Sequence, residues 1–219
     1  MPVTAPFNLK KWIDDHRDLL KPPVGNQCVY KDAENFIVMV VGGPNARKDY
    51  HYNESEELYY QLEGNIVLKI IDEGKPKSIP INEGDMFLLP PMTPHSPQRP
   101  ANTVGLVIEK VRVEEEDEKD AFIWFCENCG NKLYEESVFV KDIVKQLPPI
   151  MERFYSSKDL RTCKKCGTVM EPPAMGRLVP DSTSRPRISP VPGRAAGTPW
   201  AARSAANGTR RRPQTSNAR

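Results

Sequence analysis

The chain has 219 residues, of which 38% are hydrophobic and 27% charged, so it has room for one β-domain with appendages or for two small domains. Its net charge of +2 is unevenly distributed: residues 174–219 hold nine arginines and one aspartate, a charge of +8, which leaves −6 on residues 1–173. No apolar run approaches the ~18 residues of a membrane span, and the N-terminus lacks the basic segment followed by an apolar one that a signal peptide has. We therefore expect a cytoplasmic protein with no membrane partner.

The first element expected is a helix over residues 8–20. Asn8 can cap it, and one face gathers His16 together with the apolar side chains of Leu9, Trp12, Ile13 and Leu20. His16 is therefore interpreted as a packing residue rather than a metal ligand. Apolar runs at residues 36–41, 66–71 and 104–112 then predict strands separated by Gly, Asn and Pro turns. Short strands at such spacing are typical of an all-β jelly-roll barrel, here with short flanking helices.

Three residues within this β-rich region can form a metal site: His51, Glu57 and His95. A polar turn separates His51 from Glu57, which begins a segment of strand composition, and the stiff segment 90–94 precedes His95. Two neutral imidazoles and one carboxylate suit a divalent transition metal that keeps positions open, as in the facial triad of non-haem Fe(II) oxygenases. The alternative is that both histidines are ordinary half-buried residues of a β-domain.

Arg47 and Asp49 alternate with His51, and alternate residues of a strand share a face. If His51 points inward, Arg47 does too, and a buried arginine is unfavourable unless it meets an anion. We interpret Arg47 and Arg99, each four residues from a histidine, as cations that bind a substrate carboxylate. An internal salt bridge from Arg47 to Asp49 or Glu57 is the alternative.

Glu109 is a second candidate for substrate binding. It lies in the predicted strand 104–112, on the face that it shares with Val107 and Val111. A carboxylate on an apolar face requires a hydrogen-bond donor, whereas a position at the barrel rim would leave it in solvent. The sequence does not choose between these two.

A charged linker at residues 113–120 precedes two C-x-x-C pairs, made by Cys126, Cys129, Cys163 and Cys166. In a cytoplasmic chain such pairs indicate a tetrathiolate metal site rather than disulfides. Four thiolates complete a tetrahedral site, so we interpret it as a structural Fe or Zn site, with redox thiols or free cysteines as alternatives. Two helices are expected between the pairs, at 138–147 and 149–155, and Cys28 is expected to be a small buried residue.

The C-terminal segment, residues 174–219, is rich in Pro, Arg, Ala, Ser, Thr and Gly. It cannot bury a core and is predicted to be disordered. Its charge could attract nucleic acid, but no aromatic residues interleave to support base recognition, so no nucleic-acid partner is expected. The predicted organisation is a barrel with its N-terminal helix at 1–118, a four-cysteine segment at 119–173 and this tail.

The spacing of the metal-site residues resembles the two cupin motifs. His51, Glu57 and Gly64 match the first motif, with Asn53 where a second histidine is usual. The second motif is matched by Gly84, Pro90 and His95, while Met92 and Arg99 replace the usual Gly and Asn. The resemblance implies a cupin jelly roll in which three protein ligands stand where four are usual.

Residues 1–173 further resemble the 3-hydroxyanthranilate 3,4-dioxygenase family, in the form that has a rubredoxin-like four-cysteine site. The resemblance rests on long strings: KPPVGN from Lys21, VGGPN from Val41, R-x-D-Y-H from Arg47, LLP from Leu88, HSP-x-R from His95, LPP from Leu147 and the two cysteine pairs. The tail has no counterpart in the family pattern.

This resemblance implies an Fe(II)-dependent ring-opening dioxygenase in which His51, Glu57 and His95 bind the catalytic iron. The substrates would be 3-hydroxyanthranilate and O2, and the product a precursor of quinolinate on the route to NAD. The resemblance also implies that Arg47, Arg99, Glu109 and Glu57 contact the substrate, that Asp49 orients Arg47, and that the protein is a homodimer. Another cupin dioxygenase for a small anionic substrate and a non-catalytic cupin binding module remain alternatives.

Overall fold

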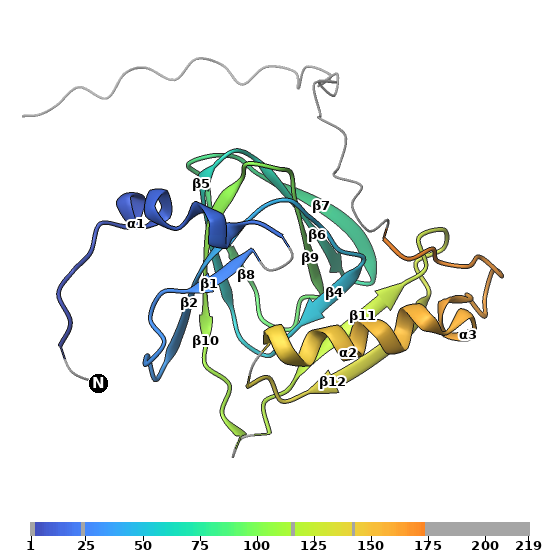
Figure 1. The fold of residues 1–219 in the computed structure, drawn as a ribbon. Helices are drawn as coiled ribbons and strands as arrows, with labels where there is room; N and C mark the ends of the chain where they lie inside the picture. The colour runs from blue at the N-terminus through green and yellow to red at the C-terminus, as the bar shows by residue number, and fades with distance from the viewer. Residues whose placement is uncertain (1–2, 23–24, 115–116, 142, 174–219) are drawn as a thin grey trace, which may run out of the picture. The chain divides into compact units, whose positions relative to one another are not determined.

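The computed structural model describes residues 3–22, 25–114, 117–141 and 143–173 (Figure 1). The predicted disorder of residues 174–219 lies outside these ranges. All described residues belong to one compact unit, and the predicted domain boundary at residue 118 stays a prediction. Among the described helices, none is long and apolar enough to cross a membrane.

Two antiparallel sheets form most of the fold. In chain order the elements are α1 (Leu9–Asp15), η1 (Arg17–Leu20), β1 (Asn26–Cys28), β2 (Phe36–Gly42), β3 (Asn45–Ala46), β4 (Asp49–Tyr52), β5 (Glu57–Glu63), β6 (Ile66–Asp72), β7 (Lys75–Ile81), β8 (Met86–Leu89), β9 (His95–Arg99), β10 (Val104–Lys110), β11 (Asp120–Phe125), β12 (Lys132–Val138), α2 (Ile143–Ser156) and α3 (Lys158–Arg161). One sheet has the order β1-β2-β10-β5-β8; the other has the order β12-β11-β4-β9-β6-β7, with β3 paired to β9. This confirms the predicted β-dominated fold.

The main core lies between the two sheets because strands of both sheets point alternate apolar side chains toward it. One sheet contributes Val41, Tyr59, Leu89 and Val107, and the other contributes Ile66, Leu68, Ile70 and Ile81. β6 shows the alternation plainly, with its buried residues at every second position. The predicted metal ligands His51, Glu57 and His95 lie at buried positions of their strands, on the same inner faces.

The N-terminal helix is shorter than predicted. Asn8 caps α1 as expected, since its side chain accepts a hydrogen bond from the Lys11 amide at 2.9 Å. The α-helix ends at Asp15, and residues 17–20 form a 3₁₀ turn. Ile13 and Leu20 pack on Val40 and Val104 at one end of the first sheet. His16, which follows α1, contacts the helix: its Nδ1 lies 2.7 Å from the Trp12 carbonyl oxygen and its ring stacks on Trp12.

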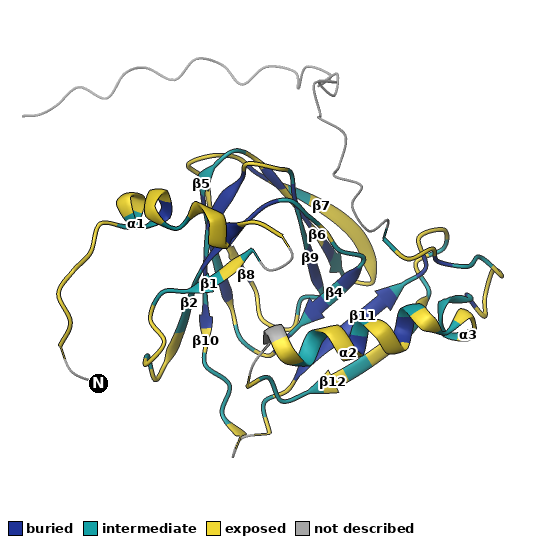
Figure 2. Cartoon of the chain, viewed as in Figure 1, coloured by how far each residue is buried: buried dark blue, intermediate teal, exposed yellow. Residues whose placement is uncertain are grey.

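The region between the cysteine pairs differs from the sequence prediction. Residues 132–138 form strand β12, and one helix, α2, replaces the two helices expected at 138–147 and 149–155. α2 continues through Pro148 and Pro149, which lack amide donors and would ordinarily interrupt a helix. Packing overrides that tendency, because Ile150 and Phe154 are buried against Phe122 and Trp124 of β11. Figures 1 and 2 show α2 lying across β11 and β12, with the buried residues of β11 beneath it.

Candidate active site

His51, Glu57 and His95 converge inside the barrel. His51 on β4 stands directly opposite His95 on β9 in the strand register, and Glu57 is the first residue of β5. The Nδ1 atom of His51 lies 3.2 Å from one Glu57 oxygen, and Nε2 of His95 lies 3.2 Å from the other. All three residues are buried, and their donor atoms lie within 4.8 Å of one another. The three predicted ligands therefore form one metal-sized cluster.

Two neighbouring side chains hold the Glu57 carboxylate in place. Asn53 donates from Nδ2 to one oxygen at 2.9 Å, and the Tyr59 hydroxyl donates to the other at 2.7 Å. Asn53 thus supports the glutamate from the position where the cupin motif usually has a second histidine. Burial raises the pKa of Glu57, but the charges and hydrogen bonds of His95 and His51 lower it by more. The pKa of Glu57 therefore lies well below its ordinary value.

The electrostatics of the cluster favour a bound cation. Burial lowers the pKa of His51, yet its hydrogen bonds with Asp120 and Glu57 outweigh this and raise the pKa to about 9. The positive charge is drawn to Glu57, which among the described residues has no lysine or arginine within ion-pair distance. A divalent metal ion between Glu57 and the two imidazoles would supply that positive charge, and two nitrogens with one carboxylate oxygen suit a transition metal.

The two candidate substrate arginines have different surroundings. Arg47 is paired: its Nε donates to both oxygens of Asp49 at 3.0 Å, and Asp49 is fully buried. Arg99 is only 1% exposed, its Nε has no hydrogen-bond partner, and its Nη1 donates to Gln61 at 3.3 Å. Among the described residues, no carboxylate lies within ion-pair distance of Arg99. Burial accordingly lowers the pKa of Arg99 to about 10.

Glu109 lies on the inner face of β10 and is buried. It stands opposite Glu57 in the register between β10 and β5. Burial and the charge of Glu57 raise the pKa of Glu109, while an ion pair at 2.7 Å from Arg112 opposes the shift. The burial of Glu109 excludes the alternative that this residue lies at the barrel rim in solvent.

Sequence reasoning missed Asp120, which it placed in the charged linker 113–120. Asp120 is the first residue of β11, is 1% exposed, and has Oδ2 2.8 Å from Nε2 of His51. The available signal was its position directly before the apolar run 121–125, because an acid that adjoins a buried strand requires a buried partner.

The four cysteines form a separate cluster. Cys126 and Cys166 have sulfurs 3.6 Å apart, as do Cys129 and Cys163, and all four sulfurs lie within 4.8 Å of one another. The two turns have the same form: Gly130 and Gly167 take positive φ and donate to the carbonyls of Cys126 and Cys163 at 2.9 Å. Hydrogen bonds with Thr168 lower the pKa of Cys166 to about 5. Cys28 stands apart and is half-buried rather than buried as expected.

Two antiparallel sheets with a buried His-Glu-His cluster between them define a β-sheet protein with three donor atoms that could hold a metal ion. The family model described as 3-hydroxyanthranilic acid dioxygenase matches residues 1–155, and the chain belongs to this family.

Relatives extend this match over most of the chain. The 3-hydroxyanthranilate 3,4-dioxygenase of Xanthomonas euvesicatoria pv. vesicatoria (strain 85-10) is 52% identical over 179 residues, covering 82% of this chain and 99% of the relative. The 3-hydroxyanthranilate 3,4-dioxygenase of Jannaschia sp. (strain CCS1) is 53% identical over 177 residues, covering 79% of this chain and 97% of the relative. The match to a solved cupin-2 domain containing protein from Shewanella frigidimarina has 15% identity and a TM-score of 0.37, and it covers 46% of this chain and 92% of that protein.

Proposed function

We propose that this chain is a 3-hydroxyanthranilate 3,4-dioxygenase, which opens the ring of 3-hydroxyanthranilate with O2. The bond between the hydroxyl-bearing C3 and C4 breaks, C3 becomes a carboxylate and C4 an aldehyde, and both oxygen atoms enter the product. That product, 2-amino-3-carboxymuconate semialdehyde, is the precursor of quinolinate and thus of NAD. The observation that carries the proposal is the buried three-donor cluster in a chain half identical to proteins of that name.

The catalytic metal is proposed to be Fe(II), held by His51, Glu57 and His95. The donor set fits it, and three protein donors leave positions for the substrate and for O2. When bound, the iron supplies the redox chemistry that lets O2 react with the aromatic ring. Asn53 and Tyr59 fix the two oxygens of Glu57, so this ligand keeps its orientation through the reaction.

The substrate carboxylate is proposed to pair with Arg99. A buried guanidinium with an unused Nε is unfavourable until an anion arrives, so binding energy is concentrated there. Arg47, held by Asp49, would contact the substrate or O2 from a fixed position. Glu109 would accept a hydrogen bond from the amino or hydroxyl group of the substrate. Together these groups orient the ring beside the metal.

The four-cysteine cluster is proposed to hold a second Fe or Zn with a structural role, since four thiolates leave no position for substrate.

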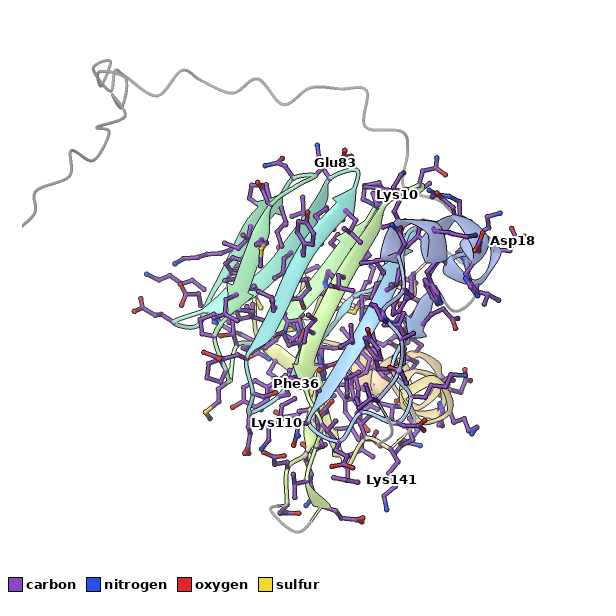
Figure 3. All side chains as sticks on the ribbon, turned by 90° about the vertical axis from the view of Figure 1, so that its left-hand side faces the viewer. Lys10, Asp18, Phe36, Glu83, Lys110 and Lys141 are labelled. Atoms are coloured by element: carbon purple, nitrogen blue, oxygen red, sulfur yellow. The ribbon has the colours of Figure 1, made fainter. Side chains whose placement is uncertain are left out.

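The protein is further proposed to be a homodimer. Several apolar side chains on the outer face of the first sheet are exposed, namely Phe36, Met86 and Leu88. Figure 3 shows Phe36 beside Lys110 at one end of this sheet. A second copy would cover this face, and light scattering would measure the mass.

The test is turnover by the purified protein after anaerobic loading with Fe(II). On addition of 3-hydroxyanthranilate in aerated buffer, we expect the ring-opened product to grow and then decay, with one O2 consumed per substrate. 2-Aminophenol, which lacks the carboxylate, should have a kcat/KM lower by about 100-fold, since a charged hydrogen bond of ~1.5–3 kcal/mol is lost. No product, despite iron at the His51 site, would reject this substrate and favour another small anionic one.

A further inference from the structure

β11 lies directly against the metal ligand His51. In the register between β11 and β4, Phe122 stands opposite His51. The two rings stack with centroids 5.5 Å apart and planes 22° apart, and Phe122 is 1% exposed. A strand that follows the barrel in sequence thus fixes the plane of a ligand ring within the barrel.

Asp120 limits the rotation of the His51 ring within that plane, because it contacts one ring nitrogen. Nδ1 of His51 faces Glu57 and His95, so a metal bound to His51 uses the lone pair of Nδ1. The ring proton must then lie on Nε2, which donates to Asp120 Oδ2 at 2.8 Å. Such a carboxylate sets the tautomer of a metal-bound histidine and raises the basicity of the ligand nitrogen.

Arg112 connects this carboxylate to Glu109. Its Nε lies 2.7 Å from Asp120 Oδ1, and its Nη2 lies 2.9 Å from Asp120 Oδ2 and 2.7 Å from Glu109 Oε2. The Arg112 side chain is only 6% exposed, and its Nη1 donates to the Lys110 carbonyl at 2.7 Å. One guanidinium therefore holds two buried carboxylates, one beside the metal ligand and one on the inner face near Glu57.

We propose that Asp120 is the positioning residue of His51, and that Arg112 ties Asp120 to Glu109, so that one buried network sets both metal affinity and substrate binding. The role of Asp120 concerns the metal alone. The role of Glu109 in this network rests on the proposed function, because it requires the substrate to contact Glu109.

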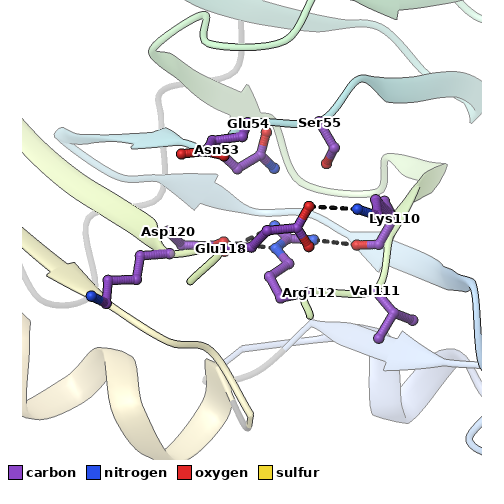
Figure 4. A pocket seen from close by; sticks show the side chains of 9 residues that line it. Asn53, Glu54, Ser55, Lys110, Val111, Arg112, Glu118 and Asp120 are labelled. Carbon is purple, nitrogen blue, oxygen red and sulfur yellow. Dashed lines mark hydrogen bonds and ion pairs between the residues drawn. The ribbon is translucent and has the colours of Figure 1, made fainter. Parts of the chain in front are cut away.

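Variants of the network should fold. Arg112 and Asp120 line a small pocket next to Asn53, shown in Figure 4. Space adjoining the pair allows water to satisfy groups that a substitution leaves unpaired, which lowers the penalty of an orphaned buried charge.

The first experiment measures Fe(II) affinity without substrate. Protein with Zn(II) held at the four-cysteine site is titrated anaerobically with Fe(II) against a competing chelator. We expect D120N to weaken Fe(II) binding by about 10- to 100-fold, the usual effect of losing a partner of a metal-bound histidine. The matched control is D72N, at an exposed aspartate of β6 that pairs with Lys77, and it should stay within twofold of wild type. An affinity of D120N within twofold of wild type would overturn the proposal.

A second measurement uses the wild-type protein and does not depend on a variant's folding. With Zn(II) in both sites, 15N shifts of His51 report which ring nitrogen carries the proton. We expect Nε2 to be protonated, with a slowly exchanging proton; protonation at Nδ1 would contradict the assigned role of Asp120.

The link to Glu109 is tested with R112M. We expect the KM for 3-hydroxyanthranilate to rise about tenfold and Fe(II) affinity to fall less than in D120N. An unchanged KM in an active R112M would reject the link. If the wild-type protein binds Fe(II) but does not turn over this substrate, the proposed function fails, while the affinity of D120N still decides the role of Asp120.

Discussion

The two candidate metal clusters of this molecule are built in opposite ways. The barrel cluster uses three donors from three strands, all buried, and it depends on neighbouring side chains such as Asn53, Tyr59 and Asp120. The four-cysteine cluster uses two short turns of identical form, and one of its sulfurs, that of Cys166, belongs to an exposed residue. A saturated thiolate site needs only local backbone geometry. A site that keeps positions open for reactants needs its geometry imposed by the surrounding fold.

The largest effect is expected from breaking the barrel cluster with E57A. This variant removes a proposed metal ligand and leaves Asn53 and Tyr59 without their acceptor. Loss of a catalytic metal removes several kcal/mol of transition-state stabilisation, so kcat should fall below about one thousandth of wild type. Metal analysis should show iron missing from this site and metal retained by the cysteines.

The matched control is E63A, at the other end of the same strand, where the glutamate pairs with Arg17 on the surface. It should retain near-wild-type kcat. Full activity of E57A with full iron content would remove Glu57 from the site.

The second effect concerns the thiolate cluster. C163S removes one of four sulfurs from the proposed structural site, and a structural metal contributes directly to folding free energy. We expect a loss of about 3–5 kcal/mol, or roughly 10 °C in Tm for a chain of this size, with kcat per folded, iron-loaded molecule changed by less than about twofold. C28S, at the cysteine outside the cluster, is the control and should melt like wild type. A normal Tm for C163S would argue against a structural role.

The same contrast explains what could be predicted from the sequence. The cysteine cluster is encoded in two short C-x-x-C strings, and both strings proved to be the turns that bring the sulfurs together. The convergence of His51, Glu57 and His95 was also predictable, because these residues adjoin turns at motif spacing. β alternation placed Glu109 on the same face as Val107, but it did not choose between a buried position and one at the barrel rim. Each of these inferences uses only local periodicity.

The partner of His51 was missed because it comes from a distant segment. Asp120 lies 69 residues from His51 in the chain. The charged residues before it in the sequence made it look like part of a linker. Likewise, the prolines of α2 suggested a helix break, and only the packing of Ile150 and Phe154 on β11 explains why the helix continues. Tertiary contacts override local propensity at both places.

Sequence reasoning assigned Arg47 and Arg99 the same substrate-binding role, with a salt bridge as the alternative for Arg47. In the structure Arg47 pairs with Asp49, whereas Arg99 has no ion pair among the described residues. The variant with the smallest expected effect, G105A, tests this difference between the two arginines. A Cβ atom at Gly105 would lie 2.8 Å from Gln61 Oε1 and 2.9 Å from Arg99 Nη1. Both atoms are ends of flexible side chains, so G105A should fold and displace Arg99 slightly rather than disrupt β10.

We expect G105A to raise the KM for 3-hydroxyanthranilate by about fivefold, equivalent to ~1 kcal/mol of lost binding, with kcat within about twofold of wild type. L106A, at the next residue on the opposite face of β10, is the control and should leave the KM unchanged. Steady-state kinetics on both variants measure this. The effect of G105A should vanish with 2-aminophenol, which has no carboxylate for Arg99 to bind. An equal increase in KM for both substrates would mean that the added methyl group perturbs the ring site instead, and Arg99 would lose its assignment as the carboxylate partner.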